Sequence, residues 1–134
     1  MTDEELVAAA WSARDFAHAP YSKFRVGAAL LTENGSVISG SNVESSSYGL
    51  SICAERVALS SALTAGHKQF TRLAIAAEGP LEPYPCGACL QVLSDYAQGL
   101  VILLSRAPSR FVTKTLKELL PYPFGDKHLE FPRS

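Results

Sequence analysis

The chain has 134 residues, of which 47% are hydrophobic and 19% charged, as is ordinary for a soluble globular domain. This length predicts one domain spanning residues 1–134. The net charge of −1 and the lack of a dense Lys or Arg cluster argue against nucleic-acid and membrane-surface partners. The acidic start M-T-D-E-E-L is unlike a secretory signal, and no apolar run approaches the roughly 18 residues of a membrane span. We therefore expect a cytoplasmic protein.

The first part of the chain is predicted to form a helix and a β-hairpin. The expected helix and the two expected strands cover residues 2–18, 24–32 and 37–42. T-D-E-E is a capping box in which Thr2 precedes the helix and Glu5 follows three residues later, and Pro20 ends the helix. Asn34-Gly35 between the two strands is a strong hairpin signal.

The rest of the chain is predicted to alternate helices and strands. We expect a loop at residues 45–51, helices at 52–65 and 86–99, and a short helix at 115–120. The expected strands are at residues 70–77, 100–105 and 110–113. Gly66 is well placed to end the first of these helices. The strand L-V-I-L-L-S has almost no polar residue, so both its faces should be covered. This order is typical of an α/β fold with a mixed sheet covered on both faces.

Cys53, Cys86 and Cys89 are the only cysteines of the chain. Their odd number argues against a closed disulfide framework. Cys86 and Cys89 would share one face of a helix, whereas Cys53 and Glu55 can converge only if Cys53 lies at a helix start, where the backbone is not yet helical. We therefore expect Cys53 and Cys86 at helix N-termini, where unpaired N–H groups and a partial positive charge favour thiolates.

Three thiolates are suited to zinc, and the neighbouring Glu55 and Arg56 suggest a catalytic site. Structural zinc sites use four protein ligands, whereas catalytic ones use three and leave a position for water. The possible fourth ligands His18, His67 and His128 lack supporting spacing. Glu55 could take a proton from such a water, and Arg56 could offset the negative charge of the thiolates. The plainer interpretation makes Glu55 a solvated residue of the first helical turn and Arg56 a surface arginine.

Together these residues make the chain similar to a cytidine deaminase of the short, homotetrameric, zinc-dependent type. The resemblance covers about Pro20 to Phe124. Its motifs are P-Y-S-K-F-R-V-G-A-A-L (20–30), N-V-E (42–44), C-A-E-R (53–56), P-C-G-A-C-x-Q-V-L (85–93) and E-L-L-P-x-x-F-G (118–125). It implies a three-layer α-β-α sandwich with a five-stranded mixed sheet, and one Zn²⁺ per subunit.

The resemblance also implies a role for each candidate site residue. The matches to the zinc ligands and the proton shuttle are Cys53, Cys86, Cys89 and Glu55. The matches to the nucleoside contacts are Phe24 at the pyrimidine, Asn42 and Glu44 at the ribose, and the backbone of Ala54 and Pro85 at the base edge. Without the family, Phe24 could belong to the core, and Asn42 and Glu44 to a strand end.

A homotetramer with shared active sites is also implied, in which neighbouring subunits insert Tyr48 and Phe124. The tail supports an assembly, because Tyr122, Phe124 and Phe131 would otherwise leave a monomer with an exposed aromatic end. Packing within the chain's own tail is the plainer interpretation of Phe124. Family members often have proline after the tyrosine that matches Tyr48, where this chain has Gly49, so the loop could be more mobile.

The implied reaction converts cytidine and deoxycytidine to uridine and deoxyuridine with release of ammonia, in pyrimidine salvage. A deaminase of an aminoacyl-nucleoside antibiotic shares C-A-E and P-C-G-x-C and is an alternative, although Arg56 and N-V-E favour the ordinary nucleoside. A polynucleotide deaminase fits less well, because such enzymes usually have histidine at the position of Cys53 and need a cationic groove. A non-catalytic zinc or thiol module leaves Cys53 and Glu55 without a role.

Overall fold

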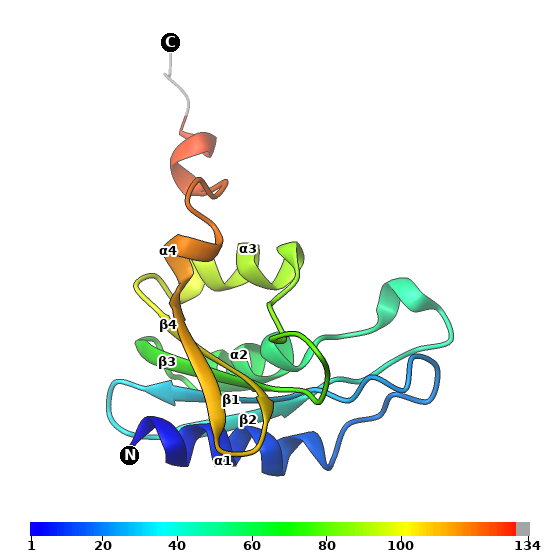
Figure 1. The fold of residues 1–134 in the computed structure, drawn as a ribbon. Helices are drawn as coiled ribbons and strands as arrows, with labels where there is room; N and C mark the ends of the chain where they lie inside the picture. The colour runs from blue at the N-terminus through cyan, green and yellow to red at the C-terminus, as the bar shows by residue number, and fades with distance from the viewer. Residues whose placement is uncertain (131–134) are drawn as a thin grey trace.

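A five-stranded mixed sheet in the order β2-β1-β3-β4-β5 forms the centre of the computed structural model, which describes residues 1–130 (Figure 1). The strands are β1 (Gly27–Thr32), β2 (Val37–Ser41), β3 (Phe70–Ala76), β4 (Val101–Ala107) and β5 (Arg110–Thr115). β1 pairs antiparallel with β2 and β3, β3 pairs parallel with β4, and β4 pairs antiparallel with β5. This mixed sheet confirms the prediction from the sequence. Phe131 of the predicted aromatic tail lies outside the described residues.

Helices cover both faces of the sheet. They are α1 (Asp3–Arg14), α2 (Ala54–Thr64), α3 (Gly87–Tyr96) and the short α4 (Leu116–Leu119). Leu6 and Val7 of α1 pack with Leu103 on one face, whereas Ile102 and Leu104 belong to the core cluster under α2 and α3 (Figure 1). Successive residues of β4 are thus buried on opposite faces, as its apolar sequence predicts. Within residues 1–130, no helix is long and apolar enough to cross a membrane.

The predicted start of α1 is confirmed, but its predicted end at residue 18 is wrong. Thr2 caps the helix and exchanges hydrogen bonds with Glu5, which completes the capping box. The helix ends at Arg14, and the backbone of His18 instead pairs with the segment around Val43, where its N–H donates to the Asn42 carbonyl at 2.9 Å. A pairing between distant segments therefore overrides the helical pattern near residue 18.

Two glycines end elements where the sequence predicts. Gly35, with φ of +90°, lies in the β1–β2 connection, and Gly66, with φ of +96°, follows α2. Beyond Gly66, the His67 N–H donates to the Ala62 carbonyl at 3.0 Å, and the Gly66 N–H donates to the Leu63 carbonyl at 3.0 Å. This pair of bonds is the Schellman arrangement, which glycine adopts without a steric penalty.

The described C-terminal segment, residues 121–130, leaves the body of the fold (Figure 1). Tyr122 is 94% exposed, and Phe124 is exposed beside His128, with ring centroids 5.0 Å apart. One anchor is the Gln91 side-chain amide, which donates to the Phe124 carbonyl at 2.7 Å. The segment contains only the short 3₁₀ turn Asp126–Leu129, as its prolines predict.

Gly40 allows α2 to lie directly against β2. A Cβ at this position would stand 2.5 Å from the Ala54 carbonyl oxygen and 2.5 Å from the Ala58 nitrogen, which are backbone atoms of α2. Rotation of a side chain cannot relieve such a clash, so the helix would have to move. Because Cys53 immediately precedes α2 and Glu55 lies in its first turn, this close packing also positions the candidate site.

We expect Gly40→Ala to lower the free energy of unfolding by about 1–3 kcal/mol, which is the usual cost of overpacking. Activity should fall by at least about tenfold in the folded fraction, since small displacements of reacting groups are costly. Urea unfolding and kcat of the same preparation measure the two effects. Gly79→Ala is the matched control, because a Cβ there meets nothing within 4 Å. Parent-like stability and kcat in Gly40→Ala would contradict this role.

Candidate active site

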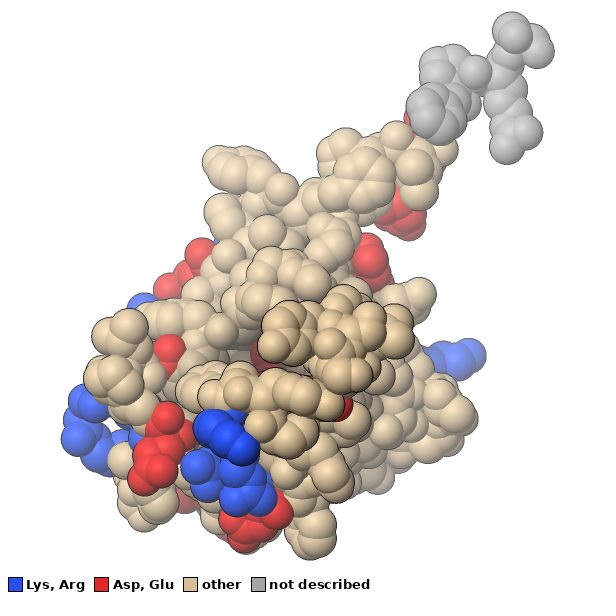
Figure 2. Space-filling view, turned by 90° about the vertical axis from the view of Figure 1, so that its right-hand side faces the viewer, with Lys and Arg blue, Asp and Glu red and all other residues tan. Residues whose placement is uncertain are grey.

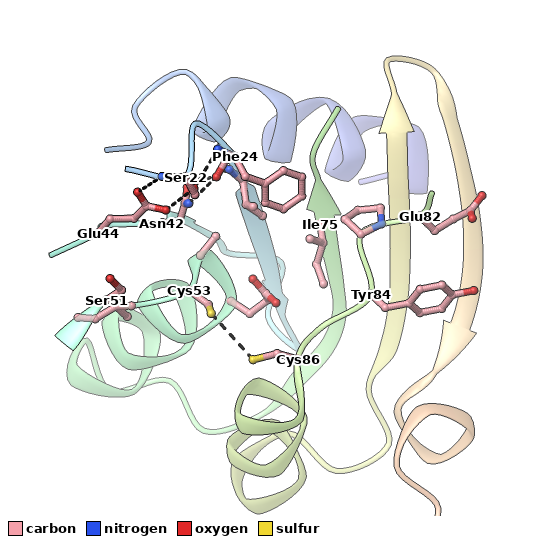
Figure 3. A pocket seen from close by; sticks show the side chains of 15 residues that line it. Ser22, Phe24, Asn42, Glu44, Ser51, Cys53, Ile75, Glu82, Tyr84 and Cys86 are labelled. Carbon is pink, nitrogen blue, oxygen red and sulfur yellow. Dashed lines mark hydrogen bonds between the residues drawn. The ribbon is translucent and has the colours of Figure 1, made fainter. Parts of the chain in front are cut away.

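The three cysteines converge although they come from two distant segments. The Sγ atoms of Cys53 and Cys86 lie 4.0 Å apart (Figure 3). Those of Cys86 and Cys89 lie 3.5 Å apart, and all three fall within 4.8 Å of one another. Tetrahedral sulfur ligands at about 2.3 Å from one zinc ion stand roughly 3.8 Å from each other. The cluster therefore has the donor type and spacing to hold one zinc ion.

Two helix starts position these sulfur atoms. Cys53 caps α2 with φ and ψ of −72° and 151°, and Cys86 caps α3 with −70° and 167°. Both backbones are extended, as the sequence argument requires. Cys89 follows in the first turn of α3 and is fully buried. The partial positive charges of both helix N-termini thus face the same group of thiols.

The electrostatics of the cluster favour a thiolate at Cys53. The neighbouring Cys89 thiol, helped by Arg56, lowers the pKa of Cys53 to about 5. The nearby Cys53 thiolate and burial raise the pKa of Cys89 well above its usual range. The metal-free cluster therefore keeps a proton on Cys89, and binding of a metal ion would release it.

Arg56 lies directly against the cluster. Its Nη2 donates to the Cys53 sulfur at 3.8 Å, and this contact raises the pKa of the guanidinium. Its Nε is buried and has no hydrogen-bond partner among residues 1–130. The predicted proximity to the thiolates is therefore present, and the side chain is not a freely solvated arginine.

Glu55 is a buried carboxyl group, only 5% exposed. Burial raises its pKa to about 7, because the charged form loses its hydration. A carboxyl group with a pKa near neutrality can both accept and return a proton. The plainer interpretation of Glu55 as a solvated first-turn residue is wrong.

A cavity of about 500 Å³ opens beside Glu55 and the cysteine cluster, a size suited to a small organic ligand (Figure 3). Seven of the predicted site residues line it, namely Phe24, Asn42, Glu44, Cys53, Ala54, Glu55 and Cys86. The other lining residues are not among those predicted from the sequence; they are Ser22, Val26, Ser51, Ile52, Ile75, Glu82, Pro83 and Tyr84. Ser22 lies within a motif quoted above, but nothing in the sequence pattern marks Glu82 or Tyr84.

Asn42 holds the segment that leads into β1. Its Nδ2 donates to the Phe24 carbonyl at 2.8 Å, and its Oδ1 accepts from the Val26 N–H at 2.9 Å. The side-chain amide thus takes the place of a strand partner, and the predicted strand 24–32 begins only at Gly27. Near Asn42, the carboxylate of Glu44 also accepts hydrogen bonds from backbone N–H groups (Figure 3).

Three of the predicted substrate contacts lie outside this lining. Pro85 is buried immediately before Cys86. Tyr48 is 76% exposed, and its ring contacts Tyr21 edge-on with centroids 6.1 Å apart. Phe124 lies on the projecting C-terminal segment. Among the described residues, no histidine joins the three cysteines, so the fourth-ligand alternative finds no support there.

Comparison with known families identifies the kind of protein. The model of the cytidine and deoxycytidylate deaminase zinc-binding region matches residues 1–105, which include all three cysteines. The chain belongs to this deaminase family. The deaminase is thus a hydrolase with a zinc-binding region, as the sequence motifs predict.

Individual relatives agree with this assignment. A cytidine deaminase of Sporosarcina psychrophila is 40% identical to this chain over 134 residues, and the match covers 98% of this chain and 97% of the relative. The crystal structure of cytidine deaminase from Burkholderia pseudomallei is 44% identical, with a TM-score of 0.87, covering 92% of this chain and 100% of that chain. A blasticidin-S deaminase of Bacillus cereus is 31% identical over 112 residues, 77% of this chain and 79% of the relative. The predicted family and α/β fold are confirmed.

Proposed function

We propose that this chain catalyses the zinc-dependent hydrolysis of cytidine and deoxycytidine to uridine and deoxyuridine with release of ammonia. The observation that carries the proposal is the buried Glu55 on the wall of the same cavity as the cysteine cluster. Cys53, Cys86 and Cys89 would hold the metal. When bound there, zinc would supply a Lewis acid that acidifies water.

Glu55 performs the proton transfers in this proposal. It takes a proton from water and delivers it to N3 of the pyrimidine, while the oxygen of that water is added at C4. Glu55 then transfers the remaining proton of the added hydroxyl to the amino group, so that the C4–N bond breaks, the C4 carbonyl forms and ammonia leaves. Its pKa of about 7 in the metal-free protein suits a group that both receives and gives protons.

The cavity walls supply the nucleoside contacts. Phe24 packs against the pyrimidine, and the backbone of Ala54 and Pro85 binds the edge of the base. Asn42 and Glu44 bind the ribose. Each of these two side chains is held by backbone groups, so each is already oriented before the nucleoside arrives.

The strongest alternative substrate is an aminoacyl-nucleoside antibiotic, because a blasticidin-S deaminase is 31% identical to this chain. The cytidine deaminases named above match this chain at higher identity and over more of its length than the blasticidin-S deaminase does. We expect kcat/KM for cytidine to exceed that for blasticidin S by at least about tenfold, because Asn42 and Glu44 of the N-V-E segment line the cavity. Steady-state rates measured with both compounds decide which is the preferred substrate. A higher kcat/KM for blasticidin S would reject the proposal.

A polynucleotide substrate fits the surface less well. On the face shown in Figure 2, Lys and Arg side chains gather in small separate areas, and no continuous basic strip crosses the face. A single-stranded polynucleotide usually needs such a basic groove. We infer a free nucleoside as substrate, and with it a role in pyrimidine salvage in the cytoplasm.

Arg56 compensates the charge of the cluster in this proposal. Removing its guanidinium in Arg56→Gln leaves the thiolates without their cationic partner. We therefore expect zinc to be lost to a chelator at a concentration about 10- to 100-fold lower, with reduced kcat. Chelator titration and zinc analysis measure this, and the exposed Arg110→Gln is the matched control. Parent-like zinc retention and kcat would return Arg56 to a structural role.

We further propose a homotetramer in which neighbouring subunits complete each cavity. Two observations support it. Tyr48 and Phe124 are exposed aromatic side chains, and neither lines the cavity of its own chain. The segment that carries Phe124 extends away from the body of the fold, as a segment that reaches a neighbour would (Figure 1).

Phe124→Ala should weaken cytidine binding by about 1–3 kcal/mol, the range for one lost stacking partner of a base. Substrate affinity is compared with the mass in solution from sedimentation of the same sample. Phe16→Ala, which removes an exposed aromatic just beyond α1, is the control and should behave like the parent. A fully active monomer would contradict both the assembly and the shared site.

A further inference from the structure

Ser22 uses both hydrogen-bonding functions of its hydroxyl at the sugar side of the cavity (Figure 3). The hydroxyl donates to Oε2 of Glu44 and accepts from the Phe24 N–H at 3.0 Å. The backbone N–H of Ser22 also donates to Oε1 of Glu44, at 3.1 Å. Since a hydroxyl has a single proton, the bond from Phe24 leaves that proton directed at the carboxylate.

The turn that carries Ser22 has a strained backbone. Lys23, between Ser22 and Phe24, has φ of +62°, a region that residues other than glycine seldom occupy. Its N–H donates to the Ala19 carbonyl at 3.1 Å. Such a conformation persists only where surrounding contacts hold it, and strain of this kind is common in segments that position ligands.

The contacts of Glu44 leave it one specific acceptor position. Oε1 already accepts the N–H groups of Tyr21 and Ser22, each at 3.1 Å, and Oε2 accepts the Ser22 hydroxyl. An ionised carboxylate offers about four lone-pair positions, so roughly one remains, on Oε2. The hydrogen bonds from Ser22 also lower the pKa of Glu44, which keeps it an acceptor only.

We propose that Ser22 is a positioning residue that sets the carboxylate of Glu44 so that Oε2 accepts one hydrogen bond from a sugar hydroxyl. The inference rests on the proposed nucleoside deaminase function and deepens it. Ser22 acts through Glu44 and takes no part in the chemistry at the pyrimidine. Its effect therefore belongs to nucleoside binding and not to turnover.

The decisive variant is Ser22→Ala, which removes the hydroxyl but keeps the backbone N–H. We expect KM for cytidine to rise about tenfold, the effect of losing one hydrogen bond to a charged group, while kcat stays within about threefold. Ser22→Thr retains a hydroxyl and should recover most of the affinity. Ser36→Ala, in the β1–β2 connection and outside the cavity lining, is the matched control.

A substrate without sugar hydroxyls separates this role from a merely structural one. With 2′,3′-dideoxycytidine, the KM penalty of Ser22→Ala should shrink to less than about threefold, because Glu44 has no hydroxyl to bind. An equal penalty with both substrates, an unchanged KM for cytidine, or a loss confined to kcat would overturn the proposal. If Ser22→Ala does not fold, the KM values of Ser22→Cys for the two substrates are compared instead, because a thiol is a weaker donor than a hydroxyl. A parent enzyme inactive on cytidine would instead refute the proposed function.

Discussion

Glu55→Gln should abolish nearly all turnover of cytidine while the zinc content and the fold remain those of the parent. Gln has nearly the same size as Glu but cannot take up and release a proton at neutral pH. General acid–base catalysis by one group typically contributes about 10²–10⁴-fold, and Glu55 serves more than one transfer in the proposed reaction. The loss in kcat should therefore reach or exceed the upper part of that range.

The matched control is Glu78→Gln. The Glu78 side chain is 80% exposed, and its carboxylate forms a solvent-exposed ion pair with Arg14 at 3.6 Å. Its kcat should equal that of the parent. Zinc analysis and circular dichroism of both variants separate a loss of chemistry from a loss of structure. If Glu55→Gln retained activity within tenfold of the parent, Glu55 would not be the proton carrier.

Removal of zinc should abolish activity, and one equivalent of zinc per chain should restore it. The cluster of Cys53, Cys86 and Cys89 has sulfur spacings that fit one ion, and no histidine of the described residues joins it. A chelator-treated sample is assayed before and after titration with zinc, with metal content measured at each step. The rate should rise linearly and reach its plateau at one equivalent.

A sample taken through the same treatment without chelator controls for damage during handling. Because metal binding displaces protons from the thiols, zinc addition should also release protons, which an indicator dye in weak buffer reports. A metal-free preparation with full activity would contradict the proposed chemistry. A plateau at two equivalents would show that a second ion is required.

The position of each cysteine at the start of its helix could be predicted from the sequence because local rules determine it. Cys53 and Glu55 are two residues apart, so they could converge only if Cys53 preceded the helix, and Cys53 does cap α2. Cys86 and Cys89 are three residues apart, a spacing that places both on one side of the first turn of α3. The three thiols themselves indicate zinc, and the family motifs then add the substrate class.

Other features depend on contacts between distant segments, which local patterns do not contain. The end of α1 at Arg14 follows from the pairing of His18 with Val43. The late start of β1 follows from the side chain of Asn42, which binds the backbone on either side of Arg25. The roles of Tyr48 and Phe124 depend on neighbouring subunits and stay predictions.

The lining of the cavity shows the same limit. Glu82 and Tyr84 belong to a proline-rich loop whose path no helical or strand period predicts, yet both line the cavity. Ser22 was part of a recognised motif, but its bonds to Glu44 and Phe24 follow from a turn with Lys23 at positive φ. Sequence periodicity does not reveal a single residue in that conformation.

The most direct test of the central claim is a product balance with the zinc-loaded enzyme and cytidine. Ammonia and uridine are quantified over time in the same reaction, at known zinc content. The account predicts that both appear in equal amounts, that deoxycytidine gives the same balance with deoxyuridine, and that neither product forms with Glu55→Gln. A folded protein with one zinc per chain that releases no ammonia from either nucleoside would contradict it.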